Sequence, residues 1–477
     1  MESYGKQLGI QKIDYPAVWS WMMNRREEYP GECFDRPIEQ LLEHYCIRDV
    51  DVLEKTYVFL TNSLESKGFS EESVELEHQV AAIIAQQERN GFKLDTIHAT
   101  CLLTDLKTKM AGIYEQMQER WPPVTLERVS EKTGKRLKDE IVTFNPGSRK
   151  QIGEKLQELG WKPKKFTETG QPIVDEVVLM DVNIPEAKLI AQYLLLQKRI
   201  AQVESWLEAI GADGRVHGKV ITNGAVTGRM THSKPNMAQI PNAGSLYGPE
   251  CRQCWTVEDG NVLVGCDASG LELRMLAHFM KDENYVRTVT EGSSKEGTDV
   301  HTVNQKAAGL ETRDQAKTFI YAFLYGAGDS KIGSIVGGSA RDGERLKNRF
   351  LEGTPSLQVL RNKVSIYATK GYVPGLDGRK IWVRSEHAAL NSLLQGAGAI
   401  VMKKALVIFN DKIKANKWPV KLVANVHDEW QFEVPAQLAE VTGEAAKQSI
   451  IEAGLFYKLR CPLDGEYKYG ANWRETH

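Results

Sequence analysis

The part of the sequence that decides the fold reads Val262-Leu263-Val264-Gly265-Cys266-Asp267-Ala268-Ser269-Gly270-Leu271-Glu272-Leu273-Arg274. A short apolar run rich in valine ends abruptly at Asp267, and two small residues and a glycine follow. Leu271, Met275 and Phe279 then recur at helical spacing. This pattern predicts a buried strand that carries a carboxylate at its end, then a turn and a helix. Because a single Asp at a strand end is usually a cap or turn residue, a chemical role for Asp267 requires a second group nearby.

A second acid, Asp428, stands between two further strand-like runs. Apolar residues alternate over 420–426 and again over 430–434, with His427-Asp428-Glu429 between them, which predicts a hairpin with acids at its turn. Acids also occur at hairpin turns for purely local reasons. If both strands belong to one sheet, Asp267 and Asp428 lie side by side, where they repel each other or bind Mg²⁺. Two such ions about 3.5–4 Å apart can activate an attacking oxygen and stabilise a leaving one.

A third pattern predicts a helix that begins after Thr312. Thr312 and Gln315 have the spacing of a capping box. Arg313, Lys317 and Tyr321 then lie four residues apart on one face, with the positive end of the helix dipole nearest Arg313. The apolar stripe that packs this helix down consists of Ala316, Phe319, Ile320 and Phe323. A triphosphate and a base fit the polar face, and the alternative is a solvated face with chance charges.

Composition sets wide limits. A chain of 477 residues can bury more than one core, and its net charge of −2 excludes a broadly basic coat but not a local nucleic-acid surface. The seven cysteines suit a reducing cytosol, and Cys251-x-x-Cys254 lacks a second ligand pair, so a zinc site is not expected. No signal peptide and no run long enough to span a bilayer are recognised, so we expect a cytoplasmic protein that is neither secreted nor bound to a membrane.

The character of the chain changes near residue 214. Before it, helices are predicted at 37–60, 71–90, 96–120 and 186–210, joined by basic loops near 131–138 and 160–165. Helices joined by basic loops are compatible with two structures. One is an arm that binds a phosphate backbone, and the other is a solvated helical bundle. After it, strands are predicted at 216–220, 262–266, 420–426 and 430–434, with a mainly helical insertion at 281–390.

Three ordered motifs resemble motifs A, B and C of family A (DNA polymerase I-like) DNA polymerases. They are Asp-x-Ser-x-x-Glu-Leu-Arg at 267–274, Arg-x-x-x-Lys-x-x-x-Tyr-x-x-x-Tyr-Gly at 313–326 and Val-His-Asp-Glu at 426–429. The amino-acid sequences at 267–274, 316–321 and 376–380 are most similar to those of the replicative enzymes of podophages. The resemblance covers essentially the whole chain and implies a DNA-templated DNA polymerase that adds dNTPs to a primer hydroxyl.

The resemblance also implies an α+β fold shaped like a right hand, with a palm on a small antiparallel sheet and helical fingers and thumb. The implied boundaries are 1–65 for the C-terminal remnant of a proofreading exonuclease domain, 66–210 for the thumb, 211–280 and 391–477 for the palm, and 281–390 for the fingers.

Motif by motif, the resemblance assigns roles at the reaction centre. Asp267 and Asp428 would bind two Mg²⁺ ions, for which Mn²⁺ can substitute, with the Ala268 carbonyl as a further ligand. Glu272 would lie beneath the incoming sugar and disfavour a ribose hydroxyl.

Nucleotide contacts follow on the fingers helix. Arg313 and Lys317 would bind the triphosphate, with His301 assisting, and Lys317 would also act in catalysis. Tyr321 would stack at the nucleotide sugar, and a Tyr at this position goes with easy acceptance of dideoxynucleotides in the family.

DNA contacts are implied at six positions. Tyr325 would lie at the templating base and His427 beside the primer terminus. The residues touching the duplex would be Arg229 and Gln239, and those reading the minor groove Asn391 and Gln395. Expected partners are therefore primer-template DNA and dNTPs, with a separate exonuclease chain, a helicase or a primase as further candidates.

Two features depart from the family. Tyr45-x-x-x-Asp49 resembles the last exonuclease motif without the earlier ones, so we expect that this chain alone does not proofread. The segment at 121–143 is short where some podophage enzymes carry an insertion that captures thioredoxin, so no thioredoxin clamp is expected. The alternatives to a DNA polymerase are a single-subunit RNA polymerase and a non-catalytic DNA-binding subunit of a split polymerase.

Overall fold

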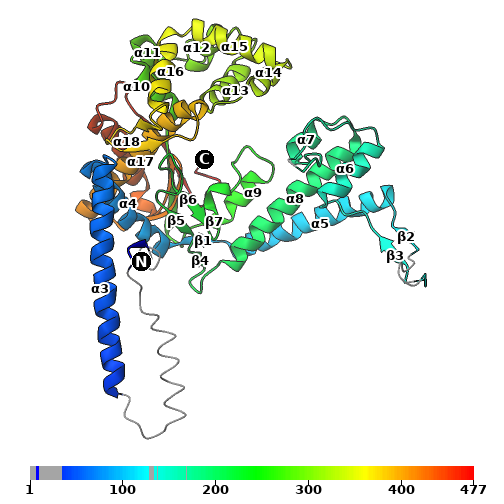
Figure 1. Ribbon diagram of the computed structural model, residues 1–477, viewed down its shortest axis with the longest axis horizontal. Helices are drawn as coiled ribbons and strands as arrows, with labels where there is room; N and C mark the ends of the chain where they lie inside the picture. The colour runs from blue at the N-terminus through cyan, green and yellow to red at the C-terminus, as the bar shows by residue number, and fades with distance from the viewer. Residues whose placement is uncertain (1–6, 10–34, 128–133, 137, 168, 477) are drawn as a thin grey trace.

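The computed structural model describes residues 7–9, 35–127, 134–136, 138–167 and 169–476. A body that contains the main sheet carries a helical domain at its upper end, and an arm built on α5 and α8 extends to one side (Figure 1). The long helix α3 (Asp35–Ser66) runs along the opposite side of the body. This is the α+β arrangement that the sequence predicts, and we call the body, the upper domain and the arm the palm, the fingers and the thumb.

The palm is built on a four-stranded antiparallel sheet with the order β11-β12-β8-β13. The strands are β8 (Asn261–Ala268), β11 (Lys421–Val426), β12 (Glu429–Pro435) and β13 (Gly465–Gly470). Because β8 is an inner strand, its valine-rich run is buried. The strands predicted at 262–266, 420–426 and 430–434 are confirmed, and they share one sheet. β13 was missed, because its polar and charged residues alternate at a half-exposed edge.

Two helices cover the palm sheet. α18 (Ala439–Phe456) packs on β8 and β13, and α17 (Glu386–Asn416) packs on α18. The rings of Phe409 on α17 and Trp430 on β12 stack with centroids 6.3 Å apart, so α17 belongs to the core. Contrary to the sequence prediction, α17 is long and apolar enough to span a membrane, but 78% of its most apolar window is buried inside the protein.

The predicted strand at 216–220 is wrong. The chain forms two shorter strands instead, β4 (Arg215–Val216) and β5 (Lys219–Ile221). β4 joins β1 (Phe92–Leu94) and β7 (Trp255–Thr256) in a small sheet, and β5 pairs with β6 (Thr231–Ser233). Gly218 breaks the run, so neither strand enters the palm sheet. Two short helical elements, η1 (Met237–Gln239) and α9 (Gly248–Gln253), follow before β7.

The fingers follow the first part of the palm. α10 (Leu271–Met280) continues from β8, as predicted. The fingers helices are α11 (Glu283–Glu291), α12 (Val300–Ala308), α13 (Arg313–Leu324), α14 (Asp329–Ser334), α15 (Ala340–Glu352) and α16 (Pro355–Ala368). A hairpin of β9 (Tyr372–Pro374) and β10 (Lys380–Trp382) leads back to α17. The helical insertion predicted between the strands is therefore confirmed.

α4 (Glu71–Asn90), which Ser70 caps and which ends at Gly91 with a φ of 60°, packs on α17 and β11 and leads into the thumb. α5 (Thr96–Arg120) and α8 (Pro185–Glu208) form the arm, and α6 (Arg149–Glu158) and α7 (Glu176–Met180) lie near its tip. On either side of the basic loop predicted at 131–138, β2 (Val124–Leu126) and β3 (Glu140–Val142) pair as an exposed hairpin, which the sequence does not predict. Part of the basic loop predicted at 131–138 lies outside the described residues.

Helix α3 confirms the helix predicted at 37–60 but not a buried apolar side. Val50 is 63% exposed and Leu53 is 55% exposed. Near the end of this helix, Val52 and Thr56 are buried, so the contacts of α3 lie on a different face from the one predicted. The side chains of Leu41 and Leu42 lie outside the described residues.

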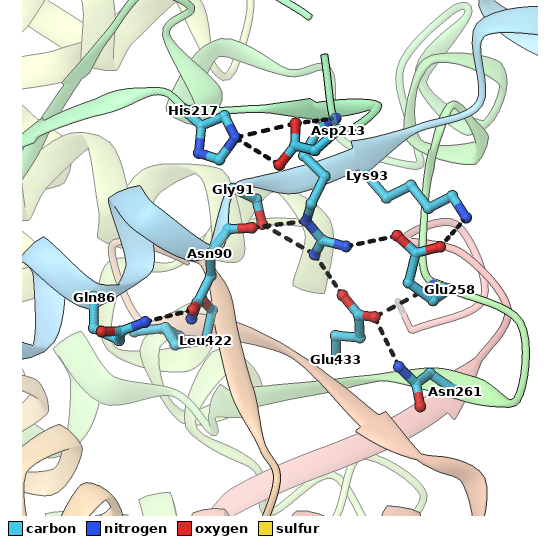
Figure 2. A network of polar contacts seen from close by, with 11 residues as sticks. Gln86, Asn90, Gly91, Lys93, Asp213, His217, Glu258, Asn261, Leu422 and Glu433 are labelled. Atoms are coloured by element: carbon cyan, nitrogen blue, oxygen red, sulfur yellow. Dashed lines mark hydrogen bonds and ion pairs between the residues drawn. The ribbon is translucent and has the colours of Figure 1, made fainter. Parts of the chain in front are cut away.

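A polar network joins the thumb to the palm (Figure 2). Buried Arg215 on β4 donates to the carbonyl of Asn90 at 2.7 Å and to that of Gly91 at 3.2 Å, and it pairs with Glu258 and Glu433. Asn261 Nδ2 donates to Glu433 at 2.8 Å. Burial alone would raise the pKa of Glu433, but the hydrogen bonds from Arg215 and Asn261 hold it below its usual value. The end of α4 is thereby fixed against β12.

Candidate active site

Asp267 and Asp428 lie at the same end of two neighbouring strands. β12 pairs with β8 so that Glu429 faces Asp267 in the register, and the Ala268 N–H donates to the Asp428 carbonyl at 3.1 Å. His427 has a φ of 60°, which allows the chain to turn within two residues between β11 and β12. The predicted meeting of the two acids at one sheet end is therefore confirmed.

The electrostatics of this pair favour a bound cation. Removal from bulk water, followed by repulsion from Asp428 and Glu429, raises the pKa of Asp267 to about 7. Burial likewise raises the pKa of Asp428, against the opposing effects of its backbone hydrogen bond and Arg229. The Asp267 side chain is still open to solvent, so an ion can reach it. Two oxygen-rich, mutually repelling carboxylates fit a hard divalent cation.

Glu429, the second acid at the hairpin turn, has a structural role. It is buried, and it accepts hydrogen bonds at 2.6 Å from Trp473 Nε1 and at 2.6 Å from Gln431 Nε2. The Arg252 guanidinium lies 3.8 Å from it. Burial raises the pKa of Glu429, and these contacts oppose the rise. Glu429 thus ties the C-terminal segment to the palm.

Glu272 connects the palm to the fingers. It lies in the first turn of α10, where the Arg229 guanidinium approaches it at 3.0 Å. The Tyr325 hydroxyl donates to Glu272 at 2.7 Å. Burial, followed by this hydrogen bond, raises the pKa of Tyr325. Three residues that the sequence assigns to sugar, template and duplex contacts therefore form one group.

Helix α13 begins as predicted. The Thr312 hydroxyl accepts from the Gln315 N–H, and the Gln315 side chain accepts from the Thr312 N–H, which completes the capping box. The predicted apolar stripe of Ala316, Phe319, Ile320 and Phe323 is buried. The side chain of Lys317 is exposed and so is available to an anionic ligand, while Arg313 is partly exposed.

Asp299 holds Arg313 and was not predicted to do so. It caps α12, and its carboxylate lies 2.7 Å from Arg313 Nη2. Partial burial alone would raise the pKa of Asp299, but hydrogen bonds from Arg313 and Thr302 lower it to about 2. In this segment the resemblance implies a role for His301 only, whereas the N-cap spacing of Asp299-Val300-His301-Thr302 could have identified Asp299.

The aromatic residues of the fingers line up with His301. The ring centroids of His301 and Tyr321 are 6.3 Å apart, as are those of Tyr321 and Tyr325. Burial, followed by repulsion from Arg313, lowers the pKa of His301. His301 on α12 therefore lies next to Tyr321 on α13, as expected if both contact the nucleotide.

Only some of the residues predicted to contact DNA lie close to one another. Arg229 and His427 line one small cavity, and burial followed by repulsion from Arg229 lowers the pKa of His427. Asn391 and Gln395 lie four residues apart on one face of α17. Gln239 lies on η1, beside β11. None of the described contacts joins Gln239, Asn391 or Gln395 to the acid pair.

Tyr45 and Asp49 lie one turn apart on α3. Neither takes part in the described contacts of the group around Asp267. Nor do the described residues contain a cluster of three or more His, Cys, Asp or Glu side chains that could hold a metal ion. Cys251 and Cys254 are buried free thiols, and burial raises the pKa of each.

Comparisons with known proteins agree with this geometry. A family model for DNA polymerase family A matches residues 121–475. The DNA-directed DNA polymerases of Enterobacteria phage T3 and Escherichia phage T7 are each 35% identical, over 100% of this chain and 82% of the phage protein. DNA polymerase I of Bacillus subtilis (strain 168) is 27% identical over 92% of this chain and 50% of its own length.

A solved structure shares the fold. It is the POL domain of Pol1 from M. smegmatis in complex with DNA primer-template and dNTP, with a TM-score of 0.72 and 22% identity. The match covers 84% of this chain and 70% of that one.

Proposed function

This chain belongs to DNA polymerase family A and is a DNA-directed DNA polymerase, and we propose that Asp267 and Asp428 form its reaction centre. The observation that carries this proposal is the position of both carboxylates at adjoining ends of β8 and β12, where the pKa of each is raised. In the reaction, a primer hydroxyl attacks the α-phosphate of a dNTP, and pyrophosphate leaves.

Family A DNA polymerases depend on metal ions, and we propose Mg²⁺ as the ion here, two per site, with Mn²⁺ as a substitute. Asp267, Asp428 and the Ala268 carbonyl would hold the ions. When bound, the ions would neutralise the carboxylates and the charge that develops on the phosphate. A cation is needed on electrostatic grounds, because two ionised carboxylates in this position repel each other.

The fingers residues suit a nucleoside triphosphate. Lys317 and Arg313 would bind its phosphates, with His301 assisting, and Lys317 would give a proton or positive charge to the leaving group. Arg313 would exchange its ion pair with Asp299 for one with phosphate. Tyr321 would stack at the sugar, and because the residue at this position is a Tyr, dideoxynucleotides are expected to be accepted. Glu272 would disfavour a ribose hydroxyl.

Primer-template DNA is the proposed second substrate. Tyr325 would contact the templating base, and His427 the primer end. Arg229 and Gln239 would contact the duplex, and Asn391 and Gln395 its minor groove. Three further predictions come from the sequence. They are a separate exonuclease, helicase or primase as partner, independence from thioredoxin, and a cytoplasmic location, which is the host cytoplasm if a phage encodes the chain.

The two alternatives are not favoured. A single-subunit RNA polymerase would not need Glu272 beneath the sugar, and a non-catalytic subunit would not need the paired acids or the exposed Lys317. Primer extension with Mg²⁺ and either dNTPs or NTPs tests the proposal. We expect dNTP incorporation that EDTA abolishes, whereas preferential use of NTPs would support the RNA polymerase instead.

A further inference from the structure

A buried group of charged side chains lies beside Arg229 and His427. It consists of Glu77 on α4, Asp377 and Arg379 from the turn between β9 and β10, and Lys403 on α17, and we call it the Lys403 cluster. Lys403 Nζ lies 2.7 and 2.8 Å from the two carboxylate oxygens of Glu77. Arg379 pairs with both acids. Two acids and two bases leave the cluster neutral, which makes its burial tolerable.

Lys403 has one donor left after it binds Glu77. An ammonium group carries three N–H donors, and two of them are taken by the Glu77 carboxylate. The third reaches Asn223 Oδ1 at 2.7 Å. Burial lowers the pKa of Lys403, and Glu77 opposes this fall. Because an unpartnered donor on a buried ammonium is unfavourable, Lys403 draws Asn223 toward it.

Asn223 belongs to the loop that carries Arg229. This loop, residues 222–230, joins β5 to β6 and is closed by hydrogen bonds from the Ala225 N–H to the Arg229 carbonyl at 3.1 Å and from the Gly228 N–H to the Ala225 carbonyl at 2.9 Å. Gly228 has a φ of 77°, and Arg379 Nη1 would lie 3.6 Å from a Cβ placed there. The Lys403 cluster therefore supports the loop through the hydrogen bond from Lys403 to Asn223, and Arg379 lies close to the backbone at Gly228.

Resting on the proposed function, we propose that Lys403 and Asn223 are positioning residues that aim Arg229 at Glu272. Arg229 lies 3.0 Å from Glu272, which also accepts from the Tyr325 hydroxyl. Any shift of the loop would therefore change the position of the carboxylate that is proposed to exclude a ribose hydroxyl. No part of the Lys403 cluster needs to touch DNA or nucleotide to have this effect.

Variants of Asn223 test the proposal, because Asn223 is exposed and its replacement should leave the fold intact. Asn223→Leu removes the acceptor at similar volume, whereas Asn223→Asp keeps it. Thr222→Ala is the matched control, since the Thr222 side chain makes no hydrogen bond to any described residue. Single-nucleotide incorporation gives kcat and KM for a dNTP and the matching NTP, and thermal melting reports stability.

We expect Asn223→Leu to lower the ratio of dNTP to NTP incorporation efficiency by about tenfold, because one charge-assisted hydrogen bond is lost. Asn223→Asp and Thr222→Ala should keep the wild-type ratio and melt like wild type. Asn223→Leu should stay folded at the assay temperature but melt at a lower temperature, because it leaves one donor of buried Lys403 without a partner. A wild-type ratio in Asn223→Leu, or an equal loss in Asn223→Asp, would overturn the proposal. If wild type itself incorporates no nucleotide, the proposed function fails instead.

Discussion

At the scale of single residues, the two acids of the proposed reaction centre destabilise the folded chain when no cation is bound. Asp267 and Asp428 are held together by the register of β8 and β12, although their charges repel. The folded chain therefore binds a proton at Asp267 more tightly than an unfolded chain does, since an ordinary Asp has a pKa near 3.9. A bound divalent cation would remove this disadvantage, which links metal binding to stability.

Asp267→Asn should make the metal-free protein more stable at pH 8. The pKa of Asp267 is raised to about 7 in the folded state, so its destabilising effect grows as the pH rises from about 4 to about 7 and is complete above that. Thermal melting in EDTA should show a higher midpoint for Asp267→Asn than for wild type at pH 8 and a smaller difference at pH 5. A difference in melting midpoint that is the same at pH 5 and pH 8 would contradict the raised pKa of Asp267.

At the scale of elements, local signals predicted the helices well. Caps and stop signals are properties of a few neighbouring residues, so the ends of α4, α5 and α13 could be placed from sequence. The edge strand β13 has only tyrosines between charged residues and no aliphatic run to recognise. The Lys403 cluster could not be foreseen either, because Glu77 and Lys403 are 326 residues apart. Asp299 had a recognisable capping position, but its ion pair with Arg313 depends on how α12 and α13 pack.

Thr312→Ala should weaken nucleotide binding by loosening the start of α13. The capping hydroxyl holds the first turn, which carries Arg313, and loss of such a cap costs about 1 kcal/mol. We expect the KM for dNTPs to rise roughly three- to tenfold, with a smaller change in kcat. Thr312→Ser keeps the hydroxyl and is the control, so steady-state kinetics in which Ser and Ala behave alike would count against a capping role.

At the scale of the whole molecule, the fold was predictable because three motifs that are far apart in the sequence resemble those of one polymerase family. β8 and β12 carry the acids of the palm, and α13 of the fingers places Tyr321 close enough to Asp428 and Glu272 for their charges to raise its pKa. The polar network around Arg215 was not predictable, because it joins segments that are far apart in the sequence. The exposed face of α3 was not predictable either, because among the described residues nothing packs on Val50 and Leu53 deeply enough to bury them.

This chain alone is expected not to proofread. Tyr45 and Asp49 match only one exonuclease motif, and they lie on α3 outside the group around Asp267. Incubation with Mg²⁺ and a primer that ends in a mismatch, without dNTPs, should leave the primer length unchanged. Primer shortening that is lost in Asp49→Ala but kept in Asp428→Asn would show that the chain carries an exonuclease site after all.

The most direct test of the central claim compares primer extension by wild type, Asp267→Asn, Asp428→Asn and Asp259→Asn, with Mg²⁺ and dNTPs. Asp259 is an exposed acid just before the opposite end of β8, so its variant controls for loss of charge in this strand. The account predicts that wild type and Asp259→Asn extend the primer, while Asp267→Asn and Asp428→Asn lose activity by about a hundredfold or more. Equal extension by Asp428→Asn and wild type would contradict it.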